Sequence, residues 1–561
     1  MSSQNKKQLI LSLLCLLILQ IPNLACMAMS NDLTYSWMKE LGYLVVVLFL
    51  LLLPMTFLKR RTYFVVEAIL GLLWMPIELS SLYLNGTTAS HYFIRIIMET
   101  NWIEAREVLV SVWPMVVVML LVWGAYIIMV CRMKNDWMLP LRLRKATWIG
   151  LPVLMIAGMV GSYILLPKGR GNLWETLYVT SQKLTMKIYK IYPYDIYLAS
   201  QQYWQEKKHL TALIRELEGF RFGISPKADD NEEHYILVIG EAARYDHFHI
   251  NGYDRDTSPS LDTLNNLFSL SGLYSNANLT HSAFPIMLTR ADIQHTDRGA
   301  LERSIAEAYK EGGLQTAWLS NQPMMEFSTR IALEMDYYKA AISGLDGGNA
   351  EPDSVLYDWA ADLFDYHPAR KTFYVLHMLG SHFKYDQRYP KEYELFKPAI
   401  QASDGYSVLS AHNKDKVINT YDNTIRYTDH VLSKIIGLLR KQKGIRALIY
   451  VSDHGENLFD DKQEYSVHGT YDGTEYEAHV PCFIWLSEEY QAAYPEKVQA
   501  LERNLQKQVQ SDVLFYSLAD LGGLSAIVVP EKSLFSSELQ QQDTIRMITG
   551  DGEVRVVRNK Y

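Results

Sequence analysis

The sequence predicts a two-part fold: an N-terminal bundle of five transmembrane α-helices and a C-terminal soluble α/β domain with a largely parallel sheet. Two observations support this prediction. Apolar residues crowd into the first 166 positions of the 561-residue chain, whereas the remainder has the composition of an ordinary soluble domain. Within that remainder, short apolar strand candidates alternate with helical patterns, which is typical of a parallel sheet with crossover helices.

Five apolar runs in the first part are each long enough to cross a membrane, which takes about 20 residues. Lysines and arginines precede the first run and fill the loops after the second and fourth runs. This distribution predicts a cytoplasmic N-terminus and places everything after the fifth run on the opposite side of the membrane. The first run also has the features of a signal peptide, whose cleavage would leave the large domain on the same side. The runs lie near 8–29, 40–58, 63–84, 108–131 and 147–166.

A bridging segment separates the two parts. It mixes aromatic side chains with lysines, which suits a membrane interface, and a solvated helical linker is the alternative interpretation. Pro226 and a run of acidic residues mark the boundary that follows it. We therefore predict a transmembrane domain over 1–166, an interfacial bridging segment over 167–230 and a soluble domain over 231–561.

Charge and cysteine content narrow the functional classes. The net charge of -8 provides no basic footprint for nucleic acid, so we expect no nucleic-acid partner. Of the four cysteines, Cys15, Cys26 and Cys131 lie in apolar runs and only Cys482 lies in the soluble part. A disulfide within the soluble domain is therefore excluded.

The soluble part is expected to alternate between strands and helices. The strand candidates are 235–240, 314–320, 372–379, 446–452 and 480–486, and the helices include 299–311, 354–365, 416–441 and 497–521. Short apolar runs with β-branched residues are typical of buried parallel strands. Right-handed crossovers would bring the carboxyl ends of such strands to one edge of the sheet.

Side chains that can bind metal follow these strands. The first strand ends on a glutamate, the third is followed by a Gly-Ser-His segment, and the fourth ends on an Asp-His pair. In open α/β sheets the chemistry gathers at the carboxyl ends of the strands. Each histidine alone fits a structural role, but several of them with two carboxylates predict a metal site with oxygen and nitrogen ligands. The candidates are Glu241, His382, Asp453, His454, His468 and His479.

Six motifs follow one another in the second part of the chain. They are Ile239-Gly-Glu241-Ala-Ala-Arg244, Asn251-Gly-Tyr-Asp-Arg-Asp-Thr257-Ser-Pro259, Leu279-Thr280-His-Ser-Ala-Phe-Pro285, Ser452-Asp-His-Gly-Glu456, His468-Gly469 and His479-Val-Pro481. In this order they resemble the motifs of bacterial phosphoethanolamine transferases, a sulfatase-like branch of the alkaline phosphatase superfamily. The segment that begins at Leu279 resembles the nucleophile segment of that family. The chain's five apolar runs also match this family, whose members place their catalytic domain outside the cytoplasm.

The resemblance implies a mechanism, a cofactor and partners. It implies a domain of the alkaline-phosphatase/sulfatase type in the periplasm, anchored by several spans in a bacterial inner membrane. Thr280 would be the nucleophile on phosphatidylethanolamine, activated by Zn²⁺, one ion or two, because a coordinated dication lowers the pKa of a hydroxyl. The acceptor would be lipopolysaccharide, at a core sugar or at lipid A, or another envelope glycan. The implied metal ligands are Glu241, Thr280, Asp453 and His454, and the implied substrate-binding residues are His382, His468, His479, Asn101, Asn321 and Gln322.

Some features leave the acceptor and the exact activity open. Relatives that act on lipid A often carry cysteine pairs in the outer domain, and this chain has none available there. Those relatives also carry a lysine beside a cysteine at the position where this chain has Asn321-Gln322, a version that resembles the branch acting on core sugars. These two residues also suit the cap of a strand end. The alternative functions are a phosphoglycerol transferase of the lipoteichoic-acid-synthase kind and a catalytically inactive lipid-binding envelope scaffold. A sulfatase activity is disfavoured because no Cys/Ser-x-Pro-x-Arg segment occurs near Thr280.

Overall fold

The computed structural model divides the chain into two compact units, Met1–Lys207 and Lys208–Tyr561. Within them it describes residues 3–29, 53–85, 88–89, 94, 97–98, 113–136, 144–150, 152–153, 192–323, 326–341, 351–401, 411–460 and 464–557. Each unit is considered separately below.

The described part of the first unit is helical. One stretch of it, Arg60–Leu82, is long and apolar enough to cross a membrane, and Val116–Cys131 is a shorter apolar helix. The predicted run 8–29 is divided between two helices, and the predicted runs 40–58 and 147–166 lie largely outside the described residues. Five spans therefore remain a prediction. The α-helices are α1 (Ser3–Leu19), α2 (Ile21–Met29), α4 (Arg60–Glu67), α5 (Met75–Asn85), α8 (Trp113–Cys131) and α11 (Tyr194–Glu216), which continues into the second unit.

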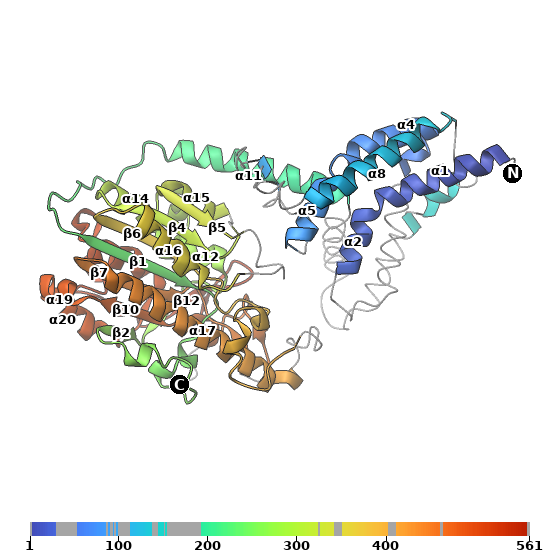
Figure 1. Ribbon diagram of the computed structural model, residues 1–561. Helices are drawn as coiled ribbons and strands as arrows, with labels where there is room; N and C mark the ends of the chain where they lie inside the picture. Colours follow the sequence, from blue (N-terminus) through green and yellow to red (C-terminus); the bar gives the residue numbers. More distant parts are fainter. Residues whose placement is uncertain are drawn as a thin grey trace. The chain divides into compact units, whose positions relative to one another are not determined.

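A seven-stranded mixed sheet forms the centre of the second unit, in the order β2-β10-β7-β1-β6-β4-β5 (Figure 1). The five strands from β7 to β5 are parallel, and β10 is antiparallel to both of its neighbours. The prediction of a largely parallel sheet is thus confirmed. The strands are β1 (Glu233–Gly240), β2 (Leu267–Leu270), β4 (Gln315–Ser320), β5 (Tyr337–Ala340), β6 (Lys371–His377), β7 (Ile445–Ser452) and β10 (Cys482–Leu486).

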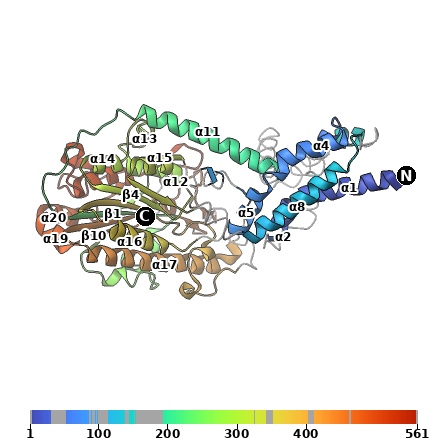
Figure 2. The ribbon, with the colours of Figure 1, turned by 45° about the horizontal axis from the view of Figure 1, so that its top comes forward.

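Helices cover both faces of this sheet, and β1 shows why two cores form. Successive side chains of a strand point to opposite faces; accordingly Leu237 and Ile239 join one apolar cluster, whereas Ile236 and Val238 join the other. Helices α12 (Thr280–Leu288), α14 (Ile305–Glu311), α15 (Glu326–Glu334), α20 (Pro495–Asn504) and α21 (Leu514–Leu521) contribute to the first cluster. Helices α16 (Val355–Tyr366) and α17 (Lys414–Lys441) contribute to the second and lie on the opposite side of the sheet (Figure 2).

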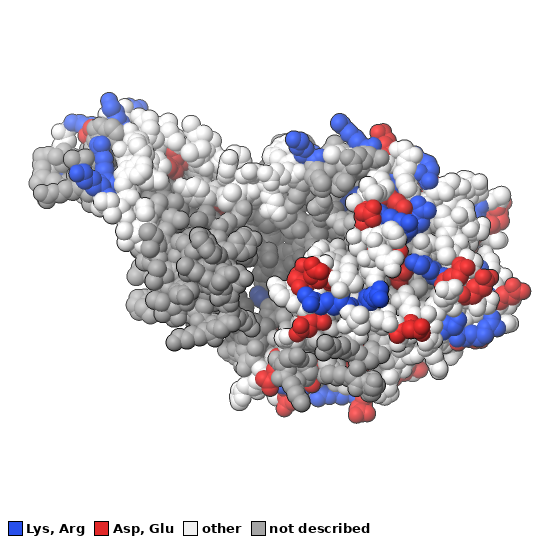
Figure 3. All heavy atoms as spheres, turned by 180° about the vertical axis from the view of Figure 1, so that it is seen from behind, with Lys and Arg blue, Asp and Glu red and all other residues white. Residues whose placement is uncertain are grey.

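Small elements complete the second unit. The short helices are α13 (Arg298–Leu301), α18 (Glu475–Ala478) and α19 (Glu488–Ala493). The short strand pairs are β3 (Leu273–Tyr274) with β11 (Val509–Gln510), β8 (Asn457–Leu458) with β9 (Ser466–Val467), and β12 (Arg546–Ile548) with β13 (Val554–Val556). On the face of this unit shown in Figure 3, acidic and basic side chains are interspersed.

Two of the predicted helices are wrong as continuous elements. The helix predicted over 497–521 is interrupted, because Val509–Gln510 form β11 and pair with β3 from a distant part of the chain. The helix predicted over 299–311 is divided into α13 and α14, because Ser304 caps the second helix by accepting a hydrogen bond from Ala306 N. Tertiary pairing and a local cap therefore override an apolar pattern that continues through both breaks.

Alanine substitutions at two glycines are expected to change the free energy of unfolding in opposite directions. A Cβ on Gly455 would collide with the backbone carbonyl oxygen of Tyr476, whereas a Cβ on Gly437, inside α17, would meet nothing within 4 Å. Gly455→Ala should therefore lower the free energy of unfolding by about 1–3 kcal/mol, and Gly437→Ala should raise it by about 0.5–1 kcal/mol. Denaturant unfolding of the two variants beside the parent chain checks both signs; equal effects would contradict the geometry.

Candidate metal centre

Neighbouring parallel strands place two carboxylates side by side. Gly240 and Ser452 are register partners at the ends of β1 and β7, and the chain continues into Glu241 on one strand and Asp453 on the other. His454 follows directly. All three side chains are at most 1% exposed. The structure therefore confirms the prediction that the ends of these two strands lie side by side.

Thr280 lies at the same place, as the first residue of α12. Its Oγ1 donates a hydrogen bond of 3.1 Å to Glu241 Oε2 and lies 3.4 Å from His454 Nε2. His454 Nε2 is in turn 3.4 Å from Glu241 Oε1 and 3.5 Å from Asp453 Oδ2. The four residues predicted as metal ligands thus form one cluster, in which a hydroxyl touches both a carboxylate and an imidazole.

The cluster has the donor atoms that a divalent metal requires. Glu241 Oε1 and Asp453 Oδ2 are buried and accept no hydrogen bond within the described part of the chain. Donor atoms of Glu241, His454 and His468 also lie within 4.8 Å of one another. Buried carboxylate oxygens need a cation or donors to offset their lost hydration. A set of carboxylate oxygens and imidazole nitrogens suits zinc, so these residues fit the ion that the sequence predicts.

In the metal-free cluster, the protonation of His454 supplies the positive charge. Burial lowers the pKa of His454, but the carboxylates of Asp453 and Glu241 outweigh it, so the pKa is raised. Burial would raise the pKa of Glu241, but the adjacent positive charge of His454 holds it well below its usual range. Burial and the charge of Glu241 together raise the pKa of Asp453. The cluster therefore favours one cation between two carboxyl groups.

Zinc binding to the metal-free protein is expected to release a proton and to weaken as the pH falls. His454 must lose its proton before its nitrogen can bind a metal. If one proton is displaced, the affinity should fall roughly tenfold for each unit of pH below the pKa of His454. Calorimetric titration with zinc in two buffers of different ionisation enthalpy measures the released proton directly. An affinity that does not change with pH would contradict this assignment of charge.

Gln322 and Asn321, which follow β4, have different partners. Gln322 Nε2 donates to Glu241 Oε2 at 3.1 Å and to the Met378 carbonyl oxygen at 2.8 Å, so Gln322 reaches the cluster through a predicted metal ligand. Asn321 Nδ2 donates at 2.8 Å to Asp353 Oδ1. The buried Asp353 carboxylate accepts the backbone N–H groups of Leu379 and Gly380. Asn321 thus supports the loop that carries His382, as a strand-end cap would.

The predicted substrate-binding histidines separate into two groups. His468 lies against the cluster, with its ring centroid 4.2 Å from that of His454, and the ring centroid of His382 lies 6.0 Å from that of His468. His479, in contrast, stacks on Tyr245 and Tyr274, and its Nε2 pairs with the Ser271 carbonyl oxygen at 3.0 Å. These contacts give His479 a structural role, and a contact with substrate remains a prediction. Asn101 lies outside the described residues.

Sequence reasoning missed two carboxylates beside the centre. Asp353 anchors the loop of His382 from a segment that carries no strand signal, so nothing in the sequence pointed to it. Glu456 pairs with His468 Nδ1 at 3.1 Å. Its position two residues after His454 was a usable signal, because the loop that holds a ligand commonly also holds the residue that orients another ligand.

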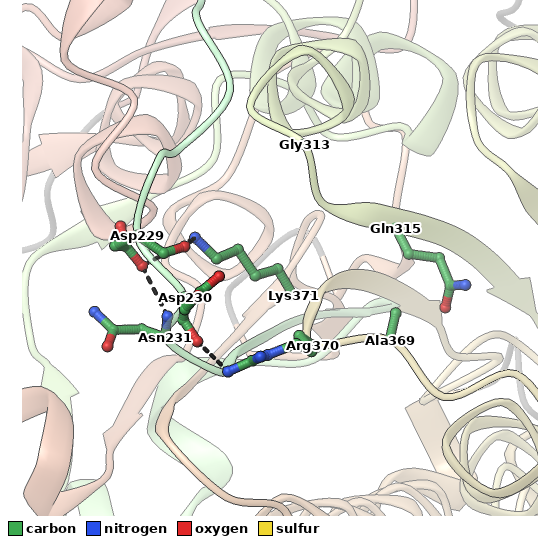
Figure 4. A pocket seen from close by; sticks show the side chains of 8 residues that line it. All are labelled: Asp229, Asp230, Asn231, Gly313, Gln315, Ala369, Arg370 and Lys371. Carbon is green, nitrogen blue, oxygen red and sulfur yellow. Dashed lines mark hydrogen bonds and ion pairs between the residues drawn. The ribbon is translucent and has the colours of Figure 1, made fainter.

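A cavity elsewhere in the second unit has a different character. It has a volume of about 270 Å³ and lies at the amino ends of β1, β4 and β6, opposite the edge that carries Glu241 (Figure 4). Lys371 pairs with Asp229 at 3.0 Å, and Arg370 donates to the Asp230 carbonyl oxygen. Because both of its cationic side chains already have partners, we assign the chemistry to the metal-binding cluster and not to this cavity.

The sheet, the threonine at a helix start and the carboxylate–histidine cluster agree with the sulfatase-like domain that the sequence motifs resemble. The chain belongs to the sulfatase family, whose model matches residues 233–524. The crystal structure of the C-terminal periplasmic domain of EcEptC from Escherichia coli, in complex with Zn, shares this fold: the TM-score is 0.52 at 24% identity, covering 58% of this chain and 92% of that one.

Characterised relatives agree with the predicted resemblance. The chain is 30% identical over 301 residues to a Kdo(2)-lipid A phosphoethanolamine 7''-transferase of Salmonella typhimurium, covering 52% of this chain and 51% of that protein. It is 24% identical over 502 residues to phosphoethanolamine transferase EptC of Escherichia coli K12, covering 84% and 82% respectively. The chain thus spans about half the length of the lipid A transferase it matches. The resemblance to phosphoethanolamine transferases is confirmed.

Proposed function

We propose that this chain is a membrane-bound phosphoethanolamine transferase. It would move phosphoethanolamine from phosphatidylethanolamine to a lipopolysaccharide acceptor through a covalent intermediate on Thr280. The observation that carries this proposal is the contact of the Thr280 hydroxyl with both Glu241 and His454 at the carboxyl edge of the sheet. The names of the relatives support the transferred group, because they are phosphoethanolamine transferases.

Glu241, Asp453 and His454 would hold zinc, with the Thr280 oxygen as the fourth ligand. The two buried carboxylate oxygens without hydrogen-bond partners support this assignment. A bound zinc ion supplies positive charge that lowers the pKa of a hydroxyl beside it and stabilises charge on a phosphoryl group. A second ion, if one binds, would be held by His468 and His382; the ring centroid of His468 lies 4.2 Å from that of His454 and 6.0 Å from that of His382.

Transfer would take place in two displacements. In the first, the Thr280 oxygen forms a bond to the phosphorus of phosphatidylethanolamine, the phosphorus–oxygen bond to diacylglycerol breaks, and the threonine proton passes to the diacylglycerol oxygen. In the second, an acceptor oxygen forms a bond to phosphorus, the bond to Thr280 breaks, and the acceptor proton returns to Thr280. Each step conserves the phosphodiester and its charge.

The surroundings of Thr280 suit a phosphoryl group. Thr280 begins α12, and the first N–H groups of a helix lack partners within the helix and attract anions. The ring of His468 packs against that of His454, and the ring of His382 lies next to that of His468. These two histidines would contact the phosphoryl oxygens or orient the acceptor. We keep the predicted contact of Asn101 with the donor headgroup as part of this proposal.

The membrane part of the proposal rests on the apolar sequence. The helix Arg60–Leu82 is long and apolar enough to span, and the charge distribution of the five predicted spans supports a multi-pass protein of the inner membrane with its catalytic domain in the periplasm. We propose the domain limits 1–166, 167–230 and 231–561. This placement would bring the cluster to the leaflet that supplies phosphatidylethanolamine.

Lipid turnover tests the donor. The purified full chain in detergent is given phosphatidylethanolamine or phosphatidylglycerol, each with a fluorescent acyl chain. We expect fluorescent diacylglycerol from phosphatidylethanolamine alone, together with a phosphoethanolamine adduct on the Thr280 peptide by mass spectrometry. Turnover of phosphatidylglycerol alone would favour a phosphoglycerol transferase. Bound zinc without turnover of either lipid would favour an inactive scaffold.

Envelope analysis tests the acceptor. Mass spectrometry of glycolipids from cells with and without this gene should show a phosphoethanolamine adduct on lipopolysaccharide, and fragmentation would place it on a core sugar or on lipid A. An adduct found only on a different envelope glycan would overturn the lipopolysaccharide assignment while leaving the reaction in place.

A further inference from the structure

Glu456 is a buried carboxylate, and each of its two oxygens contacts one polar side chain. It is 0% exposed. Its Oε1 lies 3.1 Å from Nδ1 of His468, and its Oε2 accepts a hydrogen bond of 2.8 Å from the Tyr385 hydroxyl. An ionised carboxylate only accepts hydrogen bonds. Where both oxygens of Glu456 accept, a neutral His468 must carry its proton on Nδ1.

The other nitrogen of His468 is then free to face the cluster. The His468 and His454 ring centroids are 4.2 Å apart, and a donor atom of His468 lies within 4.8 Å of donor atoms of Glu241 and His454. Since Nδ1 is engaged by Glu456, the atom left with a lone pair is Nε2. A carboxylate that fixes a histidine in this way is a recurring feature around metal centres, where it sets both the tautomer and the direction of the ring.

The fold brings these groups together from three separate loops. Glu456 follows His454 after β7, and the register pair Asn457–Val467 of the small β8–β9 ladder places His468 opposite it. Tyr385 comes from the loop after β6, three residues beyond His382. Glu456 therefore connects the loop of one candidate phosphoryl-binding histidine to the side chain of the other.

We propose that Glu456 is a positioning residue that holds His468 in the Nδ1–H tautomer, with its unprotonated Nε2 directed at the cluster, and that Tyr385 holds Glu456. This inference deepens the proposed function and rests on it for the part that His468 takes in transfer. Glu456 itself does not touch the reacting atoms; it acts through His468.

The first test observes the tautomer without any turnover. The metal-free full chain, labelled with ¹⁵N-histidine in detergent micelles, is studied by long-range ¹H–¹⁵N spectra, and the His468 signals are identified by their loss in His468→Ala. We expect the Nδ1–H form in the parent chain, the same form in Glu456→Gln, whose amide oxygen still accepts, and the Nε2–H form in Glu456→Leu. An Nε2–H tautomer in the parent chain would overturn the inference, as would an unchanged tautomer in Glu456→Leu.

A matched control uses another buried carboxylate of the same region. Glu477 is 0% exposed and accepts hydrogen bonds from Asn278 and Thr470. Among the described residues, its side-chain hydrogen-bond partners do not include His468, so Glu477→Gln should leave the tautomer unchanged. A tautomer change in this variant as large as that in Glu456→Leu would show that general loosening, and not the contact of Glu456, controls the ring.

The second test measures coupling during phosphoethanolamine transfer. Glu456→Leu should lower kcat about 10–100-fold, the usual effect of removing a residue that orients a site histidine. The double variant Glu456→Leu/His468→Ala should be no slower than His468→Ala alone, because Glu456 acts only through His468. If the loss of kcat in the double variant equals the product of the two single losses, the inference is overturned. A parent chain that shows the predicted tautomer but transfers no phosphoethanolamine would instead overturn the proposed function.

Discussion

Replacing Thr280 with alanine is expected to abolish phosphoethanolamine transfer, with a loss of about 10⁴-fold or more in kcat, as is usual when a covalent nucleophile is removed. Among the described residues, no other hydroxyl is hydrogen-bonded to the side chain of Glu241 or of His454. The measurement is the release of fluorescent diacylglycerol from labelled phosphatidylethanolamine, together with the loss of the adduct on the Thr280 peptide.

Ser282→Ala is the matched control for this prediction. It removes a hydroxyl from the same first turns of α12, two residues from Thr280, and no side-chain hydrogen bond is described for it. We expect transfer close to that of the parent chain. Because Thr280 is partly exposed, its loss should also leave thermal unfolding nearly unchanged. Retained turnover in Thr280→Ala would mean that another group is the nucleophile.

The second large effect is expected for Asp453→Asn, which should lose zinc and transfer together. Asp453 Oδ1 accepts the backbone N–H groups of Ala242 and His454, and an asparagine oxygen can continue to do so. Asp453 Oδ2 faces His454 and has no hydrogen-bond partner. In asparagine this position would hold the amide NH₂ group, whose nitrogen does not bind a cation. We expect zinc affinity to fall more than about 100-fold, measured by metal content after dialysis against a competing chelator.

Asp422→Asn separates this effect from the general loss of a buried charge. Asp422 is 0% exposed, but its partners are His247, Tyr253 and Arg255. This control should keep its zinc even if it loses stability. Transfer that survives in an Asp453→Asn chain shown to be free of metal would contradict the proposed role of Asp453.

The main strands were predictable because their signals are local. The apolar run of β7 and the Asp453-His454 pair that follows it are continuous in the sequence, and so are β1 and Glu241. Parallel pairing then brings these ends together by register. The two missed strands lie at the edges of the sheet. Edge strand β5 has the sequence Tyr-Tyr-Lys-Ala, and its side chains are half-buried or exposed to solvent. Its sequence therefore lacks the apolar run of a buried strand.

The partners around the centre were not predictable in the same way. Gln322 is predicted to contact substrate, and the structure shows in addition that it donates to Glu241, 81 positions away in the chain. Asn321 has the same predicted role, and it donates to Asp353. His479 came from a motif that follows the ligands in order, and it lies stacked between two tyrosines. A residue type and its distance along the chain do not specify which of several polar neighbours its side chain will meet.

The sequence by itself determined the chemical groups and their order: an acid after one apolar strand, a threonine before a helix, and an Asp-His pair after a second strand. These features depend on side-chain type and local periodicity, which are properties of short segments. Only the tertiary structure decided that Thr280 touches Glu241 and His454, and that Glu456 contacts both His468 and Tyr385. Those contacts depend on strand register and loop closure, which are set by packing of the whole domain and not by any one segment.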